Sequence, residues 1–152
     1  MNERILIQVQ GLTVMQRTAT TNRTTTEPLL NHQDHQLIFI FGKKKIRCSS
    51  SKLLYISVYG NYCRLHVKNK NASTGSTLHE VRCSLAKLEP LDECGLVRVS
   101  NTIILNLARV DGVDGSELHI SHLTDMTFEV GRSYHQRVAE VLPFWANGLS
   151  LH

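Results

Sequence analysis

The chain has 152 residues, of which 41% are hydrophobic and 20% are charged, and its formal net charge is +4. This composition is typical of a soluble globular domain, and it excludes a collagen-like chain, a chain disordered throughout and a disulfide-rich scaffold. No apolar run approaches the roughly 20 residues of a membrane-spanning helix, and Met1–Gln10 lacks the apolar stretch of a signal peptide. We therefore expect a cytoplasmic protein without membrane insertion.

The first part of the chain changes character near residue 36. Ile5–Val9 could form one short strand, whereas the Thr-rich segment 13–27 has almost nothing to bury and is typical of a linker or weakly ordered arm. Gln36–Phe41 is short, apolar and rich in β-branched or aromatic residues, which favours a buried strand. The sequence thus predicts an N-terminal arm over residues 1–36, a folded domain over 37–143 and a C-terminal tail over 144–152.

Two β-hairpins are predicted from turn residues between alternating strands. Gly60-Asn61 and Asp114-Gly115 are residue types that tolerate the positive φ of a tight turn. The strand pairs that flank them are Leu53–Val58 with Tyr62–Val67 and Ala108–Val113 with Ser116–Ile120. Further candidate strands are Thr77–Arg82, Leu96–Val99, Ile103–Leu107 and Met126–Val130. The fold class that follows is mainly β, with a minor α component.

Two short helices complete this prediction. Leucines at positions 85, 88 and 91 follow Ser84, a candidate N-cap, and Pro90 should end or shorten this helix. The second helix is expected over Arg132–Leu142, because its apolar residues share one helical face, and Pro143 should stop it.

The cysteines show no CxxC spacing. In a reducing compartment, the four residues Cys48, Cys63, Cys83 and Cys94 are expected to be free thiols. A redox switch would need two of them close in space, and Cys83 with Cys94, which flank the first helix, is a possible pair.

The positive charge is concentrated in one segment. Residues 43–70 contain eight basic residues and no Asp or Glu: Lys43, Lys44, Lys45, Arg47, Lys52, Arg64, Lys68 and Lys70. Such a segment could neutralise phosphates of a nucleic acid. A solvated, lysine-rich face explains the charge equally well, so charge alone leaves both interpretations open.

No group of residues in the chain forms a convincing catalytic or ligand-binding motif. There is no GxxxxGK[ST] or GxGxxG loop, so nucleotide binding through these motifs is not indicated. His32 and His35 with Asp34 form one HxxH group, and His119 with His122 forms another. A three-residue step places both histidines of a strand or turn on opposite faces, which disfavours a metal site. We expect no enzyme, no cofactor and no metal. A metal-dependent enzyme that uses His119 and His122 is kept as an alternative.

Three separated clusters of polar residues have side chains suited to DNA binding. They are Gly60, Asn61 and Tyr62 at a hairpin tip, Ser100, Asn101, Thr102 and Asn106 after a strand, and Gly131, Arg132 and Ser133 at a helix start. Asn pairs with adenine and Arg with guanine in bidentate fashion, and loops or strands can enter the major groove. Each cluster also has a structural explanation as a turn, a capped loop or a helix cap.

The order of these clusters resembles a known pattern. Leu54–Tyr62 (LYISVYGNY) is similar to the "YIEA-GNY" opening of the LytTR DNA-binding domain. Gly95–Leu107 (GLVRVSNTIILNL) resembles its central "FVRIHRSYLVNL" run, and Phe128–Tyr134 (FEVGRSY) resembles its closing "LPVSRRY". The resemblance implies an elongated LytTR-type β domain whose loops contact successive major grooves of double-stranded DNA. Repeated half-sites would be occupied by two copies of the chain.

The resemblance also implies roles for particular residues. Asn106 and Arg132 match motif positions and are expected to contact bases, whereas Arg98 should contact phosphate or support the structure. The expected DNA-contacting set is Asn61, Tyr62, Arg98, Ser100, Asn101, Asn106, Arg132 and Ser133, with Lys43, Lys45, Lys68 and Lys70 on the phosphates. The chain departs from the family pattern at Ser100, Asn101, Ile103 and Gly131, which makes the groove-facing loop less basic.

We therefore expect a sequence-specific transcription regulator, controlled by its N-terminal arm, its thiols or a regulatory protein partner. The alternative is a protein-interaction module that keeps the LytTR-like fold without DNA binding. Scattering of the basic residues of segment 43–70 over the surface would favour that alternative.

Overall fold

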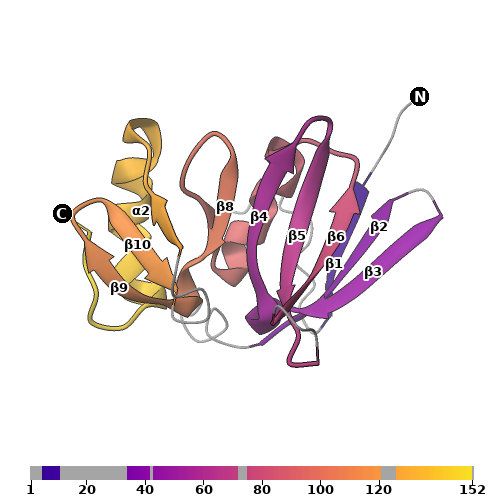
Figure 1. Ribbon diagram of the computed structural model, residues 1–152, viewed down its shortest axis with the longest axis horizontal. Helices are drawn as coiled ribbons and strands as arrows, with labels where there is room; N and C mark the ends of the chain where they lie inside the picture. Colours follow the sequence, from indigo (N-terminus) through magenta and orange to yellow (C-terminus); the bar gives the residue numbers. More distant parts are fainter. Residues whose placement is uncertain (1–4, 11–33, 42, 72–74, 121–125, 152) are drawn as a thin grey trace.

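The computed structural model describes residues 5–10, 34–41, 43–71, 75–120 and 126–151 (Figure 1). Its strands are β1 (Ile5–Gln10), β2 (Gln36–Phe41), β3 (Lys44–Ser49), β4 (Leu53–Tyr59), β5 (Tyr62–Lys68), β6 (Ser76–Val81), β7 (Leu96–Arg98), β8 (Ile103–Asn106), β9 (Val110–Asp114), β10 (Glu117–Ile120) and β11 (Thr127–Glu129). The helices are 3-10 helices η1 (Ser50–Lys52), η2 (Leu85–Cys94), η3 (Leu107–Arg109) and η5 (Arg132–Tyr134), and the α-helix α2 (His135–Trp145). The fold is mainly β, as the sequence predicts.

Three antiparallel sheets succeed one another along the long axis of the molecule (Figure 1). A five-stranded sheet of order β6-β5-β4-β8-β7 lies in the middle, with a β1-β2-β3 sheet toward one end and a β11-β10-β9 sheet with α2 toward the other. Pairing of β1 with β2 runs from Ile5 opposite Phe41 to Gln10 opposite Gln36. Part of the expected N-terminal arm therefore belongs to a sheet, while the Thr-rich segment lies outside the described residues.

The apolar side chains form two clusters because the central sheet buries both of its faces. In β5, Cys63, Leu65 and Val67 alternate with more exposed residues and join a cluster with β2, β3 and η2. Leu105 of β8 points into the second cluster, which contains residues of the β9–β11 sheet and α2. The central sheet is thereby held from both sides, which fixes the positions of its strand ends.

Both predicted hairpins are confirmed, with one change of turn position. Tyr59 pairs with Tyr62 across Gly60-Asn61, and Gly60 has a φ of 64°. In the second hairpin Asp114 pairs with Glu117, so the two turn residues are Gly115-Ser116 rather than Asp114-Gly115. A positive φ of 67° at Gly115 explains why glycine suits that position.

The helices correct three details of the prediction. η2 is a 3-10 helix that continues through Pro90 to Cys94, and the side chain of Ser84 forms no cap hydrogen bond. Its buried residues recur every three positions, at 85, 88, 91 and 94, which is the period of a 3-10 helix. Likewise, α2 continues through the exposed Pro143, because buried side chains on both sides of that proline, Leu142 and Trp145, anchor its last turn.

Candidate nucleic-acid interface

The tips of several elements lie along one edge of the molecule. Figure 1 shows the β4–β5 turn, the β7–β8 loop and the start of α2 along the same upper edge. Two backbone hydrogen bonds contribute to this arrangement: Val58 N–H donates to the Thr102 carbonyl at 3.1 Å, and Gly131 N–H donates to the Val99 carbonyl at 2.8 Å. Apart from Asn106, the three polar clusters, which are far apart in the sequence, are thus brought to one edge.

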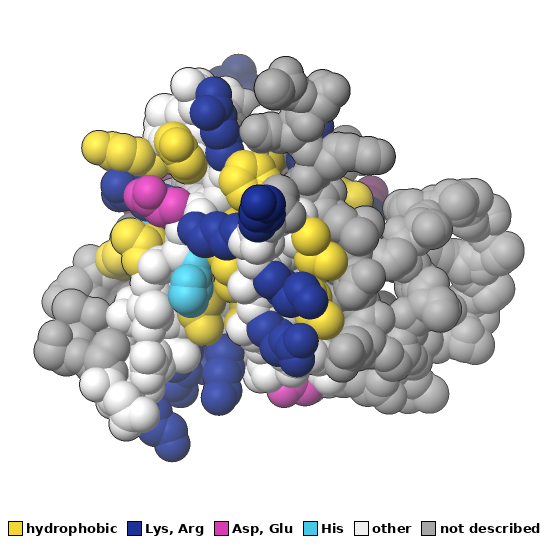
Figure 2. All heavy atoms as spheres, turned by 90° about the vertical axis from the view of Figure 1, so that its right-hand side faces the viewer, with side chains coloured by type: hydrophobic (Ala, Val, Ile, Leu, Met, Phe, Trp, Pro, Cys, Tyr) yellow, Lys and Arg dark blue, Asp and Glu magenta, His cyan; other side chains and the backbone are white. Residues whose placement is uncertain are grey.

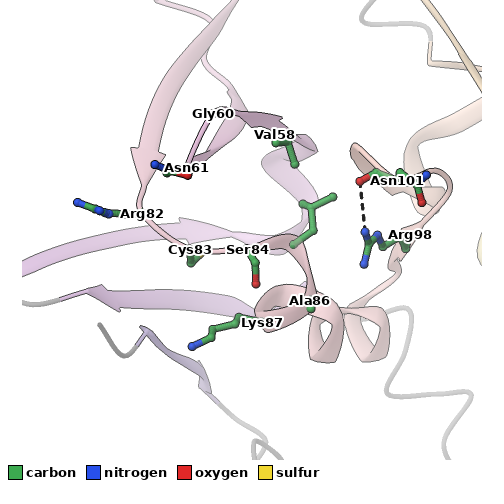
Figure 3. A pocket seen from close by; sticks show the side chains of 11 residues that line it. Val58, Gly60, Asn61, Arg82, Cys83, Ser84, Ala86, Lys87, Arg98 and Asn101 are labelled. Carbon is green, nitrogen blue, oxygen red and sulfur yellow. Dashed lines mark hydrogen bonds between the residues drawn. The ribbon is translucent and has the colours of Figure 1, made fainter. Parts of the chain in front are cut away.

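A basic pocket of about 1180 Å³ opens between the hairpin tip, the start of η2 and the β7–β8 loop (Figure 3). Three cationic side chains line this pocket: Arg82, Lys87 and Arg98. Asn61 and Asn101 add amide groups, and the described residues that line the pocket include no Asp or Glu. The combination of cations and amides is suited to binding an anionic polymer such as DNA.

The side chain of Arg98 holds the β7–β8 loop in place. Its Nε donates to the Ser100 carbonyl at 3.2 Å, and one Nη donates to the Asn101 carbonyl at the same distance. The other Nη forms an ion pair with Glu89 at 2.7 Å. Because most of its donors are used within the protein, Arg98 serves the structural role that the sequence allowed, although it still faces the pocket.

The start of the last helix is attached to the same loop. The hydroxyl of Tyr134 donates to Oδ1 of Asn101 at 2.9 Å, and the guanidinium of Arg98 lies 5.6 Å from the centre of the Tyr134 ring. Arg132 and Ser133 are exposed beside this contact, in η5. Their exposure leaves both side chains accessible to a macromolecule that meets this edge.

The hairpin tip presents aromatic surface next to the pocket. Tyr59 is 58% exposed and Tyr62 is 40% exposed, so both side chains are accessible to solvent. The guanidinium of Arg64 covers the Tyr59 ring at 3.5 Å from its centre. Asn61 lies between these tyrosines and is also exposed. An exposed amide at a hairpin tip can contact base edges or sugars.

Asn106 does not belong to this surface, so its predicted base contact is wrong for this structure. Its side chain is 1% exposed, and its Nδ2 donates to the carbonyls of Ser50 at 3.0 Å and Leu53 at 2.8 Å. Its Oδ1 accepts a hydrogen bond from Ala108 N–H at 3.1 Å. Asn106 therefore joins the end of β8 to η1 and η3 and has no group directed to a ligand.

None of the basic residues of segment 43–70 lines the pocket. Figure 2 shows that Lys and Arg side chains outnumber acidic ones on the face at the β1-β2-β3 end of the molecule. Lys43 and Lys45 are exposed beside the β2–β3 turn, and the ammonium of Lys44 donates to the Glu80 carbonyl near the end of β6. Lys68 is the last residue of β5 and Lys70 follows it, so both are about 20 Å from Asn61 at the rise of a strand. They do not line the pocket.

Two basic residues of the pocket were missed from the sequence. Arg82 follows β6, and Lys87 lies in the first turn of η2, so both flank Ser84. Neither lies in a segment that resembles the LytTR motifs, and both lie outside the basic segment 43–70. The presence of two basic residues within one turn of the predicted helix start is the sequence signal that could have indicated them.

The histidine groups of the sequence lie elsewhere. Residues 32 and 122 are outside the described part of the chain, so the structure describes one histidine of each HxxH group, His35 and His119. The carboxylate of Asp34 accepts hydrogen bonds from the Ser50 hydroxyl at 3.3 Å and from Ser51 N–H at 3.1 Å, which ties it to η1.

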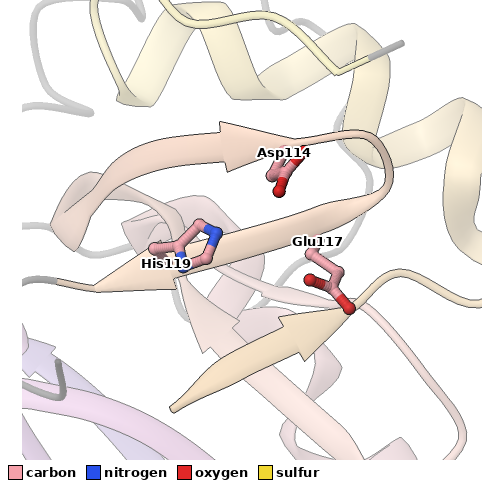
Figure 4. Close-up of side chains that lie close together, drawn as sticks. All are labelled: Asp114, Glu117 and His119. Carbon is pink, nitrogen blue, oxygen red and sulfur yellow. The ribbon is translucent and has the colours of Figure 1, made fainter. Parts of the chain in front are cut away.

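His119 lies with two carboxylates on the outer face of the β9–β10 hairpin (Figure 4). Ligand atoms of Asp114, Glu117 and His119 are all within 4.8 Å of one another. The strand register explains the grouping, because Asp114 is directly opposite Glu117, and His119 follows two residues later on the same face. Surface carboxylates often gather in this way without an ion. A closed structural zinc site would need four ligands.

No helix in the described parts of the chain is both long and apolar enough to cross a membrane. Comparison with models of known protein families gives no match for the chain, and a search of curated proteins gives none either. The similarity of three segments to the LytTR domain therefore stays a prediction from the sequence.

Proposed function

We propose that the protein binds double-stranded DNA through the edge that carries the β4–β5 turn, the β7–β8 loop and the start of α2. The observation that supports this proposal is the basic pocket, which Arg82, Lys87 and Arg98 line together with Asn61 and Asn101. Phosphate groups of DNA attract such cations, and neutralisation of phosphates releases bound counterions. In the cell, the protein would act as a transcription regulator in the cytoplasm.

Within this proposal, different residues have different tasks. Arg82 and Lys87 bind phosphates and position the protein, whereas the exposed Arg132 and Asn61 reach base edges. Lys43 and Lys45 extend the phosphate contacts toward the β1-β2-β3 end of the molecule. Two copies of the chain bind repeated half-sites, as the resemblance to the LytTR domain implies.

The alternative is a protein-interaction module without DNA binding. The distance of Lys68 and Lys70 from the pocket favours it, because the basic residues do not form a single compact patch. The engagement of Arg98 with Glu89 favours it as well. Both functions would use the same exposed tyrosines, so only a binding experiment separates them.

The first experiment selects DNA from a random-sequence pool with the purified protein at a stated salt concentration, and sequences the bound fraction. Enrichment of a short repeated motif supports the regulator. Binding without enrichment, or absence of binding, favours the interaction module. Arg132→Ala should weaken binding to the specific DNA site alone, by about 1–3 kcal/mol. Lys45→Ala should weaken binding to specific and to random DNA equally. Equal losses for both kinds of DNA in Arg132→Ala would contradict its role.

The pocket itself is tested by the salt dependence of DNA binding. The double variant Arg82→Ala/Lys87→Ala should lower the slope of log K against log salt by about 2, one for each lost phosphate contact. The matched control is Lys52→Ala, because Lys52 is exposed and lies at the end of β4 that is away from the hairpin tip. If the control lowers the slope as much as the double variant, the pocket is not the phosphate site.

A further inference from the structure

Part of one face of the central sheet is open to solvent, over the neighbouring strands β4, β5 and β6 (Figure 1). Cross-strand partners in the register share one face of a sheet, and alternate residues of each strand belong to it. This face includes Tyr59 of β4, Tyr62, Arg64 and His66 of β5, and Leu78 and Glu80 of β6. All six are half-buried or exposed, and we call them the tyrosine face.

Exposed apolar side chains gather on the tyrosine face. Tyr59 is 58% exposed, Tyr62 40% and Leu78 45%. Met126 is also exposed and lies at the border of this face, because the hydroxyl of Tyr55 in β4 donates to its Sδ at 3.9 Å. Single exposed apolar residues are normal on a protein surface, whereas a group of them on one face indicates a binding surface.

The planar groups of this face are held in place by contacts within the protein. The guanidinium of Arg64 lies 3.5 Å from the centre of the Tyr59 ring, and its Nε forms an ion pair with Glu80 at 2.9 Å. The rings of His66 and Tyr55 are stacked, with 3.9 Å between their centres and 10° between their planes. Side chains that are ordered before a ligand arrives lose less entropy when it binds.

The charge around the tyrosine face favours an anionic ligand. Glu80 is its acidic member, and the ion pair with Arg64 neutralises it. Lys68 and Lys70 lie at the end of β5 that is away from the hairpin tip, whereas Arg82 follows β6 at the tip end. Cations therefore flank the rings at both ends, which suits a ligand that carries phosphates along its length.

We propose that the tyrosine face binds single-stranded DNA, with unpaired bases stacked on the rings of Tyr59 and Tyr62 and phosphates bound by the flanking cations. Every base has an aromatic face, so this stacking accepts any sequence. Base pairing in a duplex keeps those faces stacked on one another, so this ligand differs from the duplex proposed above. A protein partner would need to be acidic to match the same cations, whereas every DNA strand carries the required charge.

The first assay titrates the full-length protein against a fluorescein-labelled oligothymidylate of about 12 nucleotides, a length within the site sizes of single-strand binding proteins. Fluorescence anisotropy should show saturable binding that weakens as salt is added. Tyr59→Ala and Tyr62→Ala should each lower the affinity about fivefold or more, the effect of one lost base stack. Tyr59→Phe and Tyr62→Phe should restore the affinity to within about twofold of wild type, because stacking needs the ring and not the hydroxyl. Circular dichroism verifies that each variant is folded.

Val58→Ala is the matched control. Val58 is an exposed apolar residue of the same strand, but it pairs with Cys63 of the first core cluster and so lies on the opposite face of the sheet. Its truncation should leave the oligothymidylate affinity unchanged. Ultraviolet cross-linking of an oligonucleotide that contains 5-iodouracil should modify Leu53–Arg64, the tryptic peptide that contains both tyrosines.

Several outcomes would overturn the proposal. They are absence of saturable oligothymidylate binding, equal losses in the Ala and Phe variants, a comparable loss in Val58→Ala, and a cross-link only outside Leu53–Arg64. Binding of oligouridylate RNA without binding of oligothymidylate would overturn it as well, as would a protein ligand that Tyr59→Ala abolishes while oligothymidylate does not bind. Failure of the duplex selection refutes only the proposed function, because the oligothymidylate assay contains no duplex. Duplex binding without oligothymidylate binding refutes only the role of the tyrosine face.

Discussion

Replacement of Asn106 by alanine should destabilise the fold and leave the DNA affinity of the folded protein unchanged. The side chain is buried and makes three hydrogen bonds, to the carbonyls of Ser50 and Leu53 and from the amide of Ala108. Each such bond contributes about 1 kcal/mol net, and the groups left without a partner would remain in the interior. We therefore expect a loss of about 3 kcal/mol in the free energy of unfolding.

Urea unfolding followed by circular dichroism measures this loss. With a slope of about 2 kcal/mol per molar urea, a loss of that size lowers the unfolding midpoint by roughly 1.5 M. The matched control is Asn101→Ala, because Asn101 is exposed and its side chain accepts one hydrogen bond from Tyr134. A wild-type midpoint for Asn106→Ala together with loss of specific DNA binding would refute the reasoning, because Asn106 would then face the ligand.

Three further predictions concern stability and metal content. Gly95→Ala should lower stability by about 2–3 kcal/mol in thermal unfolding, since Gly95 has a φ of 91° and its added Cβ would lie 2.9 Å from Trp145. Gly148→Ala is the control, with a φ of 82° but open space around it, and should cost about 1 kcal/mol. Burial and then the charge of Arg64 lower the pKa of His66 from 6.5 to about 4, so the unfolded chain takes up the proton first. The contribution of His66 to the free energy of unfolding should therefore be fully present above pH 6.5. It should fall by about 2 kcal/mol toward pH 4, a figure reduced to allow for partial exposure of the ring. His66→Phe, which cannot titrate, should flatten this profile; a wild-type slope in that variant would assign the titration elsewhere. Elemental analysis should find no stoichiometric metal at the outer face of the β9–β10 hairpin.

Local signals in the sequence determined most of the strands. Gly60 with Asn61 requires a turn because few other residues adopt a positive φ without strain, and alternation on both sides then fixes which residues of β4 and β5 are buried. The same reasoning located the β9–β10 hairpin to within one residue. These features depend on neighbouring residues, so tertiary structure was not needed to find them.

Proline positions show where local reasoning failed. Pro90 and Pro143 lie within helices, although each removes one backbone donor. Buried partners on both sides, such as Leu88 and Leu91 around Pro90, supply packing that outweighs the missing hydrogen bond. The sequence showed the apolar residues but gave no measure of how much of their surface other elements would cover.

The sequence by itself determined a mainly β chain with polar groups at its turns, whereas the tertiary structure decided which of those groups share a surface. Arg82 and Lys87 line one pocket with Asn61 and Asn101 because the order β6-β5-β4-β8-β7 brings the corresponding strand ends to one edge. The same packing buries the side chain of Asn106. Strand order and burial depend on contacts between residues far apart in the chain, and a single sequence does not record those contacts.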